Sequence, residues 1–187
     1  ARAAYSLHRA MLGTGVDSAL LVGLKESNDS SVRATPLWRF SASQFTNRQI
    51  ARLQRSPVNT WRSPARFSSV SARTLNKSDA DVLHLHWVTD GFLSIEEIGR
   101  IRKPVVWSLY DMWPFAGTEH YGVNTSDARW KSGYNKANRT AQESGLDLDR
   151  WAFQRKARSW SNIGGKAVFL PASSWLTDAA KSSALMR

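Results

Sequence analysis

Residues 80–121 constrain the fold more than any other stretch of this chain, because two short apolar runs flank an amphipathic segment. The runs Val82 to Val88 and Val105 to Leu109 are typical of strands buried on both faces of a parallel sheet. Between them, apolar residues recur every three positions, at Phe92, Ile95, Ile98 and Ile101. This spacing predicts a helix of about three turns, which Pro104 ends. This pattern predicts a right-handed βαβ unit.

Polar and aromatic side chains follow both predicted strands. In parallel sheets, ligands bind beyond the carboxyl ends of the strands. We therefore expect one rim, formed by His86, Trp87, Asp90, Tyr110, Asp111, Trp113, Glu119 and His120. Asp111 suits a base or a ligand for a sugar hydroxyl, and Glu119 with His120 suits acid and base roles. Each side chain also has a structural interpretation, as a turn cap, a loop residue or a core aromatic.

The remaining segments alternate between expected helices and strands. Helices are predicted over 2–12, 45–53 and 148–160 and from Trp175 onward, and strands over 19–22, 66–70 and 167–170. Residues 25–43 and 71–80 are expected to be polar connections, and 116–145 a long functional or disordered loop. The fold class is therefore α/β, a Rossmann-like three-layer sandwich with a mainly parallel sheet, in one domain over 1–187. Its first strand is expected to lie outside this sequence, because the chain opens in a helical pattern.

The net charge of +11 predicts attraction to an anionic partner. Nucleic acid, an anionic membrane surface and a phosphorylated substrate are the candidates, beside a merely soluble basic surface. Arginines and aromatics alternate between Trp38 and Phe67, which fits ordinary packing, lipid phosphates or single-stranded nucleic acid. None of the common nucleic-acid recognition signatures is present. The absence of cysteine excludes disulfides and thiolate metal sites and fits a reducing cytoplasm.

Motifs for a metal or a phosphate-binding loop are weak. His84 and His86 share one face of the predicted strand, but no further ligand cluster lies near them in the sequence, so no metal is expected. The patterns G-x-G-x-x-G, G-x-S-x-G and a phosphate-binding lysine loop are missing.

Several motifs together resemble the amino-terminal domain of bacterial family 4 glycosyltransferases of the colanic-acid and exopolysaccharide type. The most specific is Asp111-Met-Trp-Pro-Phe-Ala-Gly117, followed by His120-Tyr121. The runs 81–88, 91–98 and 103–107 match in order, as do the opening residues 1–10, the segment 149–156 and Pro171-Ala-Ser-Ser-Trp175. The resemblance therefore covers most of the chain.

The resemblance implies a GT-B fold, in which two Rossmann-like domains face each other across a cleft. Such enzymes transfer a sugar from a nucleotide donor with retention and without a metal or other cofactor. This chain would be the acceptor-side half, and a carboxy-terminal domain beyond it would bind the nucleotide. By this resemblance, Asp111 and Tyr110 would border the transfer point as catalytic residues. The acceptor site would comprise His86, Trp87, Asp90, Trp113, Glu119 and His120.

Two features depart from the family pattern. Tyr110 stands where members commonly have a histidine that contacts the donor sugar, and the loop after the motif lacks the cysteines often found there. The expected partners are a sugar or lipid-linked sugar acceptor, an anionic membrane surface and the carboxy-terminal domain. The expected location is the cytoplasm, at the inner face of the membrane. The alternatives are a basic nucleic-acid-binding module and a non-catalytic partner-binding domain.

Overall fold

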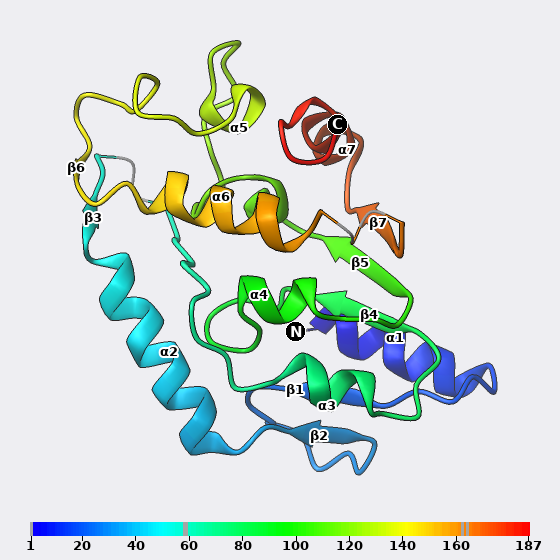
Figure 1. Cartoon of the computed structure of the whole chain (residues 1–187). Coiled ribbons are helices and arrows are strands. Elements are labelled where there is room, and N and C mark those ends of the chain that lie inside the picture. Colours follow the sequence, from blue (N-terminus) through cyan, green and yellow to red (C-terminus); the bar gives the residue numbers. More distant parts are fainter. Residues whose placement is uncertain (1, 58–59, 162, 164) are drawn as a thin grey trace.

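The computed structural model describes residues 2–57, 60–161, 163 and 165–187 and has a mixed α/β fold (Figure 1). Its central sheet holds three parallel strands in the order β4-β5-β7. These strands are β4 (Leu83–His86), β5 (Val105–Leu109) and β7 (Ala167–Pro171). The sequence predicted all three, and their parallel pairing brings their carboxyl ends to one edge.

One face of this sheet is more deeply buried than the other. Burial alternates along β5, where Val105, Trp107 and Leu109 are buried and the residues between them are partly exposed. On β7, Val168 and Leu170 are exposed. The expectation that both faces are buried is therefore wrong, because side chains alternate between the two faces and no described element seals the second one.

The helix between β4 and β5 is shorter than predicted. α4 (Ile95–Gly99) has five residues and begins at Ser94, whose hydroxyl accepts a hydrogen bond from the Glu97 amide. The preceding residues instead form a turn, in which Leu93 N donates to Val88 O. The predicted apolar stripe does face the core, since Ile95, Ile98 and Ile101 are buried.

The connection from β5 to β7 carries the long segment 116–145 and then α6 (Leu148–Ser159), which packs against α4. The segment follows the 3₁₀ turn η1 (Trp113–Phe115) and includes α5 (Arg129–Ser132) and β6 (Ser144–Gly145). β6 pairs antiparallel with β3 (Gln54–Arg55). The final helix, α7 (Ser174–Ser182), begins at Ser173, whose hydroxyl caps it as the sequence indicated.

The amino-terminal part differs more from expectation. α1 (Arg2–Gly13) and β1 (Leu20–Val22) were predicted, but β1 pairs in parallel with β2 (Val32–Ala34), inside the supposed polar connection. α2 (Leu37–Ala51) begins directly after Pro36, earlier than predicted. α3 (Ala72–Asn76) lies in the expected loop 71–80. Residues 66–70 form no strand, because Asn47 binds the backbone of Arg66 and Phe67 instead.

The core surrounds β5 and the turn after it. Its largest fully buried side chains include Trp107, Leu109, Met112, Trp113, Phe115 and Trp130. The two indoles Trp107 and Trp113 both meet Trp160 of α6 edge to face. Within the described residues, no helix is both long and apolar enough to cross a membrane.

Candidate functional site

The carboxyl ends of β4 and β5 form the candidate site. His86 lies opposite Ser108 in the parallel register, so the residues that follow each strand share one edge of the sheet. A small hollow of about 10 Å³ lies there, lined by residues from both loops, among them Trp87, Thr89, Tyr110, Asp111 and Trp113. This volume holds about one water molecule. A larger ligand would therefore lie across the surface of the rim.

Trp87 is held in a strained conformation. Its φ of 31° is rare for a bulky residue and costs about 1–3 kcal/mol, so contacts around it must fix it. Its indole Nε1 donates to Asp111 Oδ2 at 3.1 Å, which links the loop after β4 to the loop after β5. The residue remains 45% exposed, so the rim is open to solvent at Trp87.

Asp111 is the centre of the rim, and both of its carboxylate oxygens are occupied. Oδ1 accepts a hydrogen bond from the Trp113 amide at 3.0 Å. Oδ2 faces both Trp87 Nε1 and His120 Nδ1, the latter at 2.6 Å. Since Asp111 is also buried, its evident role is to position the two rings.

His120 extends this chain of contacts inward. Its Nε2 lies 2.8 Å from the hydroxyl of Ser63, and its backbone amide donates to Trp61 O. The order Ser63, His120, Asp111 is that of a hydrolase triad. However, Ser63 is buried and does not line the hollow, so a substrate has no access to its hydroxyl. The three residues form a structural support beneath Trp87.

Tyr110 and His86 form the outer part of the rim. The Tyr110 hydroxyl lies 2.9 Å from His86 Nδ1, and the His86 ring stacks on His84 at 4.0 Å between centroids. Burial, with the neighbouring His84, lowers the pKa of His86 to about 4. His86 is therefore a neutral imidazole near pH 7, able to donate one hydrogen bond and accept another.

Two predicted site residues lie elsewhere. Asp90, whose φ of 52° turns its side chain toward α2, binds Gln44 Nε2 at 2.6 Å and Arg48 Nη2 at 3.1 Å. Glu119 points into the interior, where it accepts a short hydrogen bond from the Tyr134 hydroxyl. The structure thus gathers His86, Trp87, Tyr110, Asp111, Trp113 and His120 and separates Asp90 and Glu119 from them.

Glu119 belongs to a buried polar cluster with Asp149 and Arg62. The Arg62 guanidinium lies 2.5 Å from Asp149 Oδ2, and Gln54 Nε2 donates to the same oxygen at 2.6 Å. Hydrogen bonds and this cation hold the pKa of the Asp149 carboxyl well below its usual range. Burial and then the Asp149 charge raise the pKa of Glu119 to about 8. The cluster is therefore one carboxylate, one neutral acid and one cation.

The buried ammonium of Lys156 fixes the turn after Asp111. Its Nζ donates to the carbonyl oxygens of Trp113, Ala116 and Gly117, and it lies 4.0 Å from the centre of the Trp113 ring. Three acceptors use all three N–H groups of the charged form. Burial lowers the pKa of Lys156 to about 7, and the nearby acidic side chains, Glu119 first, oppose this shift. α6 thereby holds the Asp-Met-Trp-Pro-Phe turn in place.

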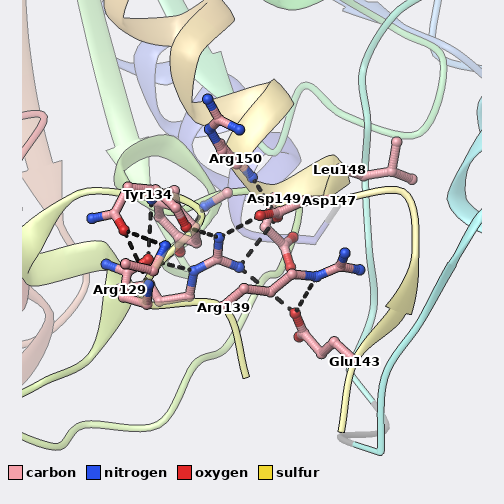
Figure 2. Close-up of polar contacts among 12 residues, drawn as sticks. Arg129, Tyr134, Arg139, Glu143, Asp147, Leu148, Asp149 and Arg150 are labelled. Atoms are coloured by element: carbon pink, nitrogen blue, oxygen red, sulfur yellow. Dashed lines mark hydrogen bonds and ion pairs between the residues drawn. The ribbon is translucent and has the colours of Figure 1, made fainter. Parts of the chain in front are cut away.

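The long segment 116–145 is ordered by arginines rather than by regular structure (Figure 2). Arg129 Nη2 lies 2.7 Å from Asp147 Oδ2, and Arg139 donates to the carbonyl oxygens of Gly145 and Leu146. Glu143 lies 3.6–3.7 Å from the guanidinium nitrogens of both arginines. The segment therefore forms an ordered clamp on the start of α6, so the disordered alternative is wrong, and a functional role for the loop stays a prediction.

Sequence reasoning missed Ser63, Arg62, Asp149 and Lys156, which support the rim from remote segments. Lys156 was expected to lie around the apolar face of its helix, although its place three residues after Phe153 and four before Trp160 could have indicated burial. In the part of the chain that the structure describes, no three histidine, aspartate or glutamate side chains gather as metal ligands. No family model matches the chain, and comparisons with curated proteins and solved structures gave no match either.

Proposed function

We propose that this chain is the acceptor-side domain of a nucleotide-sugar-dependent glycosyltransferase, in the Rossmann-like half of a GT-B fold. The observation that carries the proposal is the exposed indole of Trp87, held by Asp111 beside Tyr110 and His86. Sugars are recognised by flat aromatic faces together with hydroxyl, imidazole and carboxylate partners. The rim offers this combination at the edge of the sheet where ligands of parallel sheets bind.

Each rim residue then has a separate role. Trp87 stacks on the C–H face of the acceptor sugar, while the Tyr110 hydroxyl and the neutral His86 exchange hydrogen bonds with its hydroxyls. Asp111 positions the indole and His120, because its oxygens are already occupied. Tyr110 borders the transfer point. Stabilisation of the leaving diphosphate would come from a donor-binding domain beyond these residues.

The proposal extends to the location of the reaction. A lipid-linked acceptor is presented at the inner membrane face, and a chain of net charge +11 is attracted to that anionic surface. Peripheral association from the cytoplasm is therefore part of the proposal. Binding to phosphatidylglycerol vesicles that is no stronger than binding to phosphatidylcholine vesicles would remove this part and leave the sugar site untouched.

A panel of free mono- and disaccharides, followed by saturation-transfer NMR, tests the sugar site. Trp87→Ala should weaken binding of the best ligand about tenfold, because it removes the stacking surface. Trp175→Ala is the matched control, since that indole on α7 is 44% exposed against 45% for Trp87. Equal loss in both variants, or no binding to any sugar, would contradict the proposal.

A turnover assay separates the acceptor role from a complete enzyme. The 187-residue chain, incubated with a nucleotide sugar and the best ligand of the panel, should neither hydrolyse the donor nor transfer its sugar. Turnover that survives repurification would show that the donor site lies within this chain and would overturn the assignment to the acceptor side.

A further inference from the structure

A second and much larger hollow is lined by residues of α2, α3, α4 and the segment 68–71. Its volume is about 310 Å³, and it shares no lining residue with the rim. Its lining includes four serines and one arginine: Ser43, Ser68, Ser69, Ser71 and Arg39. The proposed sugar transfer makes no use of this hollow.

The hydroxyl of Ser69 has no partner among the described residues, although the side chain is only 8% exposed. Leaving a buried hydroxyl unpaired costs about 1–3 kcal/mol, so such groups call for an explanation. The main chain at this position is fixed, because Ser69 N donates to Gly91 O at 2.8 Å and Val70 N donates to Phe92 O at 3.1 Å. Ser69 thus carries an unpaired, buried hydroxyl on a residue that lines the hollow.

The charges of the hollow favour an anion. Arg39 forms no ion pair or side-chain hydrogen bond with any described residue, and its guanidinium lies 5.2 Å from the Trp38 ring. Glu97 also lines the hollow, but its carboxylate is already engaged by the Ala72 amide and, at 2.8 Å, by Arg100 Nη1. One arginine without an ion pair among the described residues thus lines the hollow together with several serines.

The walls are fixed before any ligand arrives. The Asn47 side chain on α2 accepts hydrogen bonds from Arg66 N and Phe67 N and donates to Phe67 O, which ties the serine segment to the helix. On the same helix, the backbone of Gln44 approaches Gly91 so closely that an added Cβ would lie 2.6 Å from Gln44 N. A ligand therefore meets a preformed site.

We propose that this hollow binds a phosphate group, with Arg39 as the cation and the hydroxyl of Ser69 as a buried donor. A phosphate oxygen pairs well with a guanidinium and accepts hydrogen bonds from several hydroxyls at once. Exposed apolar side chains near the hollow, Leu37, Trp38 and Phe67, suit either a soluble phosphate ester or the headgroup of a lipid.

The test is a titration of the ¹⁵N-labelled chain with inorganic phosphate and pyrophosphate at constant ionic strength. Saturable shifts should centre on the amides of residues 68–71. Arg39→Gln should weaken binding about tenfold, and Ser69→Ala should weaken it by a smaller factor. Lys181→Gln on α7 removes the same charge from an exposed position and should change nothing. Both Arg39 and Lys181 are exposed, so these variants should fold.

Sedimentation with vesicles distinguishes the source of the phosphate. Phosphatidylcholine vesicles with and without phosphatidic acid are compared for the parent chain, Arg39→Gln and Lys181→Gln. Binding that depends on phosphatidic acid and on Arg39, without binding of free phosphate, identifies a lipid headgroup. Binding of free phosphate that Arg39→Gln weakens identifies a soluble ligand. The absence of any Arg39-dependent binding, or an equal loss in Lys181→Gln, would overturn the proposal.

Discussion

Asp111 and His120, nine residues apart, are joined by a contact of 2.6 Å between Asp111 Oδ2 and His120 Nδ1 in the buried floor of the rim. The same carboxylate oxygen faces the indole nitrogen of the exposed Trp87. A buried pair thus determines the orientation of a surface ring. This relationship connects the stability of the rim with the proposed recognition of a sugar.

Asp111→Asn should lower the free energy of unfolding by about 1–3 kcal/mol. Both carboxylate oxygens of Asp111 accept hydrogen bonds, and the amide nitrogen of asparagine, itself a donor, cannot replace one of them. Urea unfolding measures this change. Asp81→Asn is the control, since Asp81 is exposed and precedes β4, whereas the rim follows the carboxyl end of that strand. A loss for Asp111→Asn no larger than that of the control would show that the pair does not support the rim.

Lys156→Met should be among the most damaging single changes, with a loss of about 3–5 kcal/mol in the free energy of unfolding. The thioether fills similar space but leaves the carbonyl oxygens of Trp113, Ala116 and Gly117 without their donor. Chemical denaturation followed by circular dichroism gives the value. Lys136→Met, at an exposed position, should stay within about 0.5 kcal/mol of the parent chain.

Glu119 predicts a pH dependence with a defined sign. Its pKa of about 8 in the folded chain lies above its ordinary value of 4.5, so between these pH values the folded chain holds a proton that the unfolded chain has lost. Stability from this group therefore falls as pH rises from about 4.5 to about 8. The measurement is the free energy of unfolding across this range for the parent chain and for Glu119→Gln.

The difference between the two curves isolates Glu119, because His86, whose lowered pKa makes stability rise between about 4 and 6.5, is present in both. The advantage of the parent chain over Glu119→Gln should shrink by about 1 kcal/mol or more across the range. Glu26→Gln, at an exposed position, should show a flat difference. A parent advantage that stays constant from about pH 4.5 to about 8 would mean that Glu119 is already ionised in the folded chain.

The sequence was informative where structure follows local patterning. Apolar runs located β4, β5 and β7, and the ends of two parallel strands placed Trp87 and Asp111 at one rim. The direction of a side chain within a loop follows no such pattern. Asp90 and Glu119 were therefore wrongly predicted to face the rim, although the residues next to them were correctly predicted to lie there. The positive φ of Asp90 turns its side chain away from the rim, and the spacing of residues in the sequence does not reveal a positive φ.

Contacts between remote segments were also beyond the sequence. Ser63 reaches His120 across 57 positions, and Lys156 reaches the turn at Trp113 across 43. Each depends on how α6 and the segment before β4 fold back over the sheet. The short α4 was missed for a related reason, since the spacing of its apolar residues fits a turn followed by a helix as well as one long helix.

The measurement that tests the central claim most directly is ¹⁹F NMR of the chain labelled with 5-fluorotryptophan, titrated with the same phosphate-free saccharides. The nine tryptophan signals, assigned by Trp→Phe variants, report which indoles meet a sugar. The proposal predicts a saturable shift of the Trp87 signal and no shift of Trp38 or Trp175. An unmoved Trp87 signal across the panel, or an equal shift of Trp175, would contradict the proposal that this rim holds the acceptor.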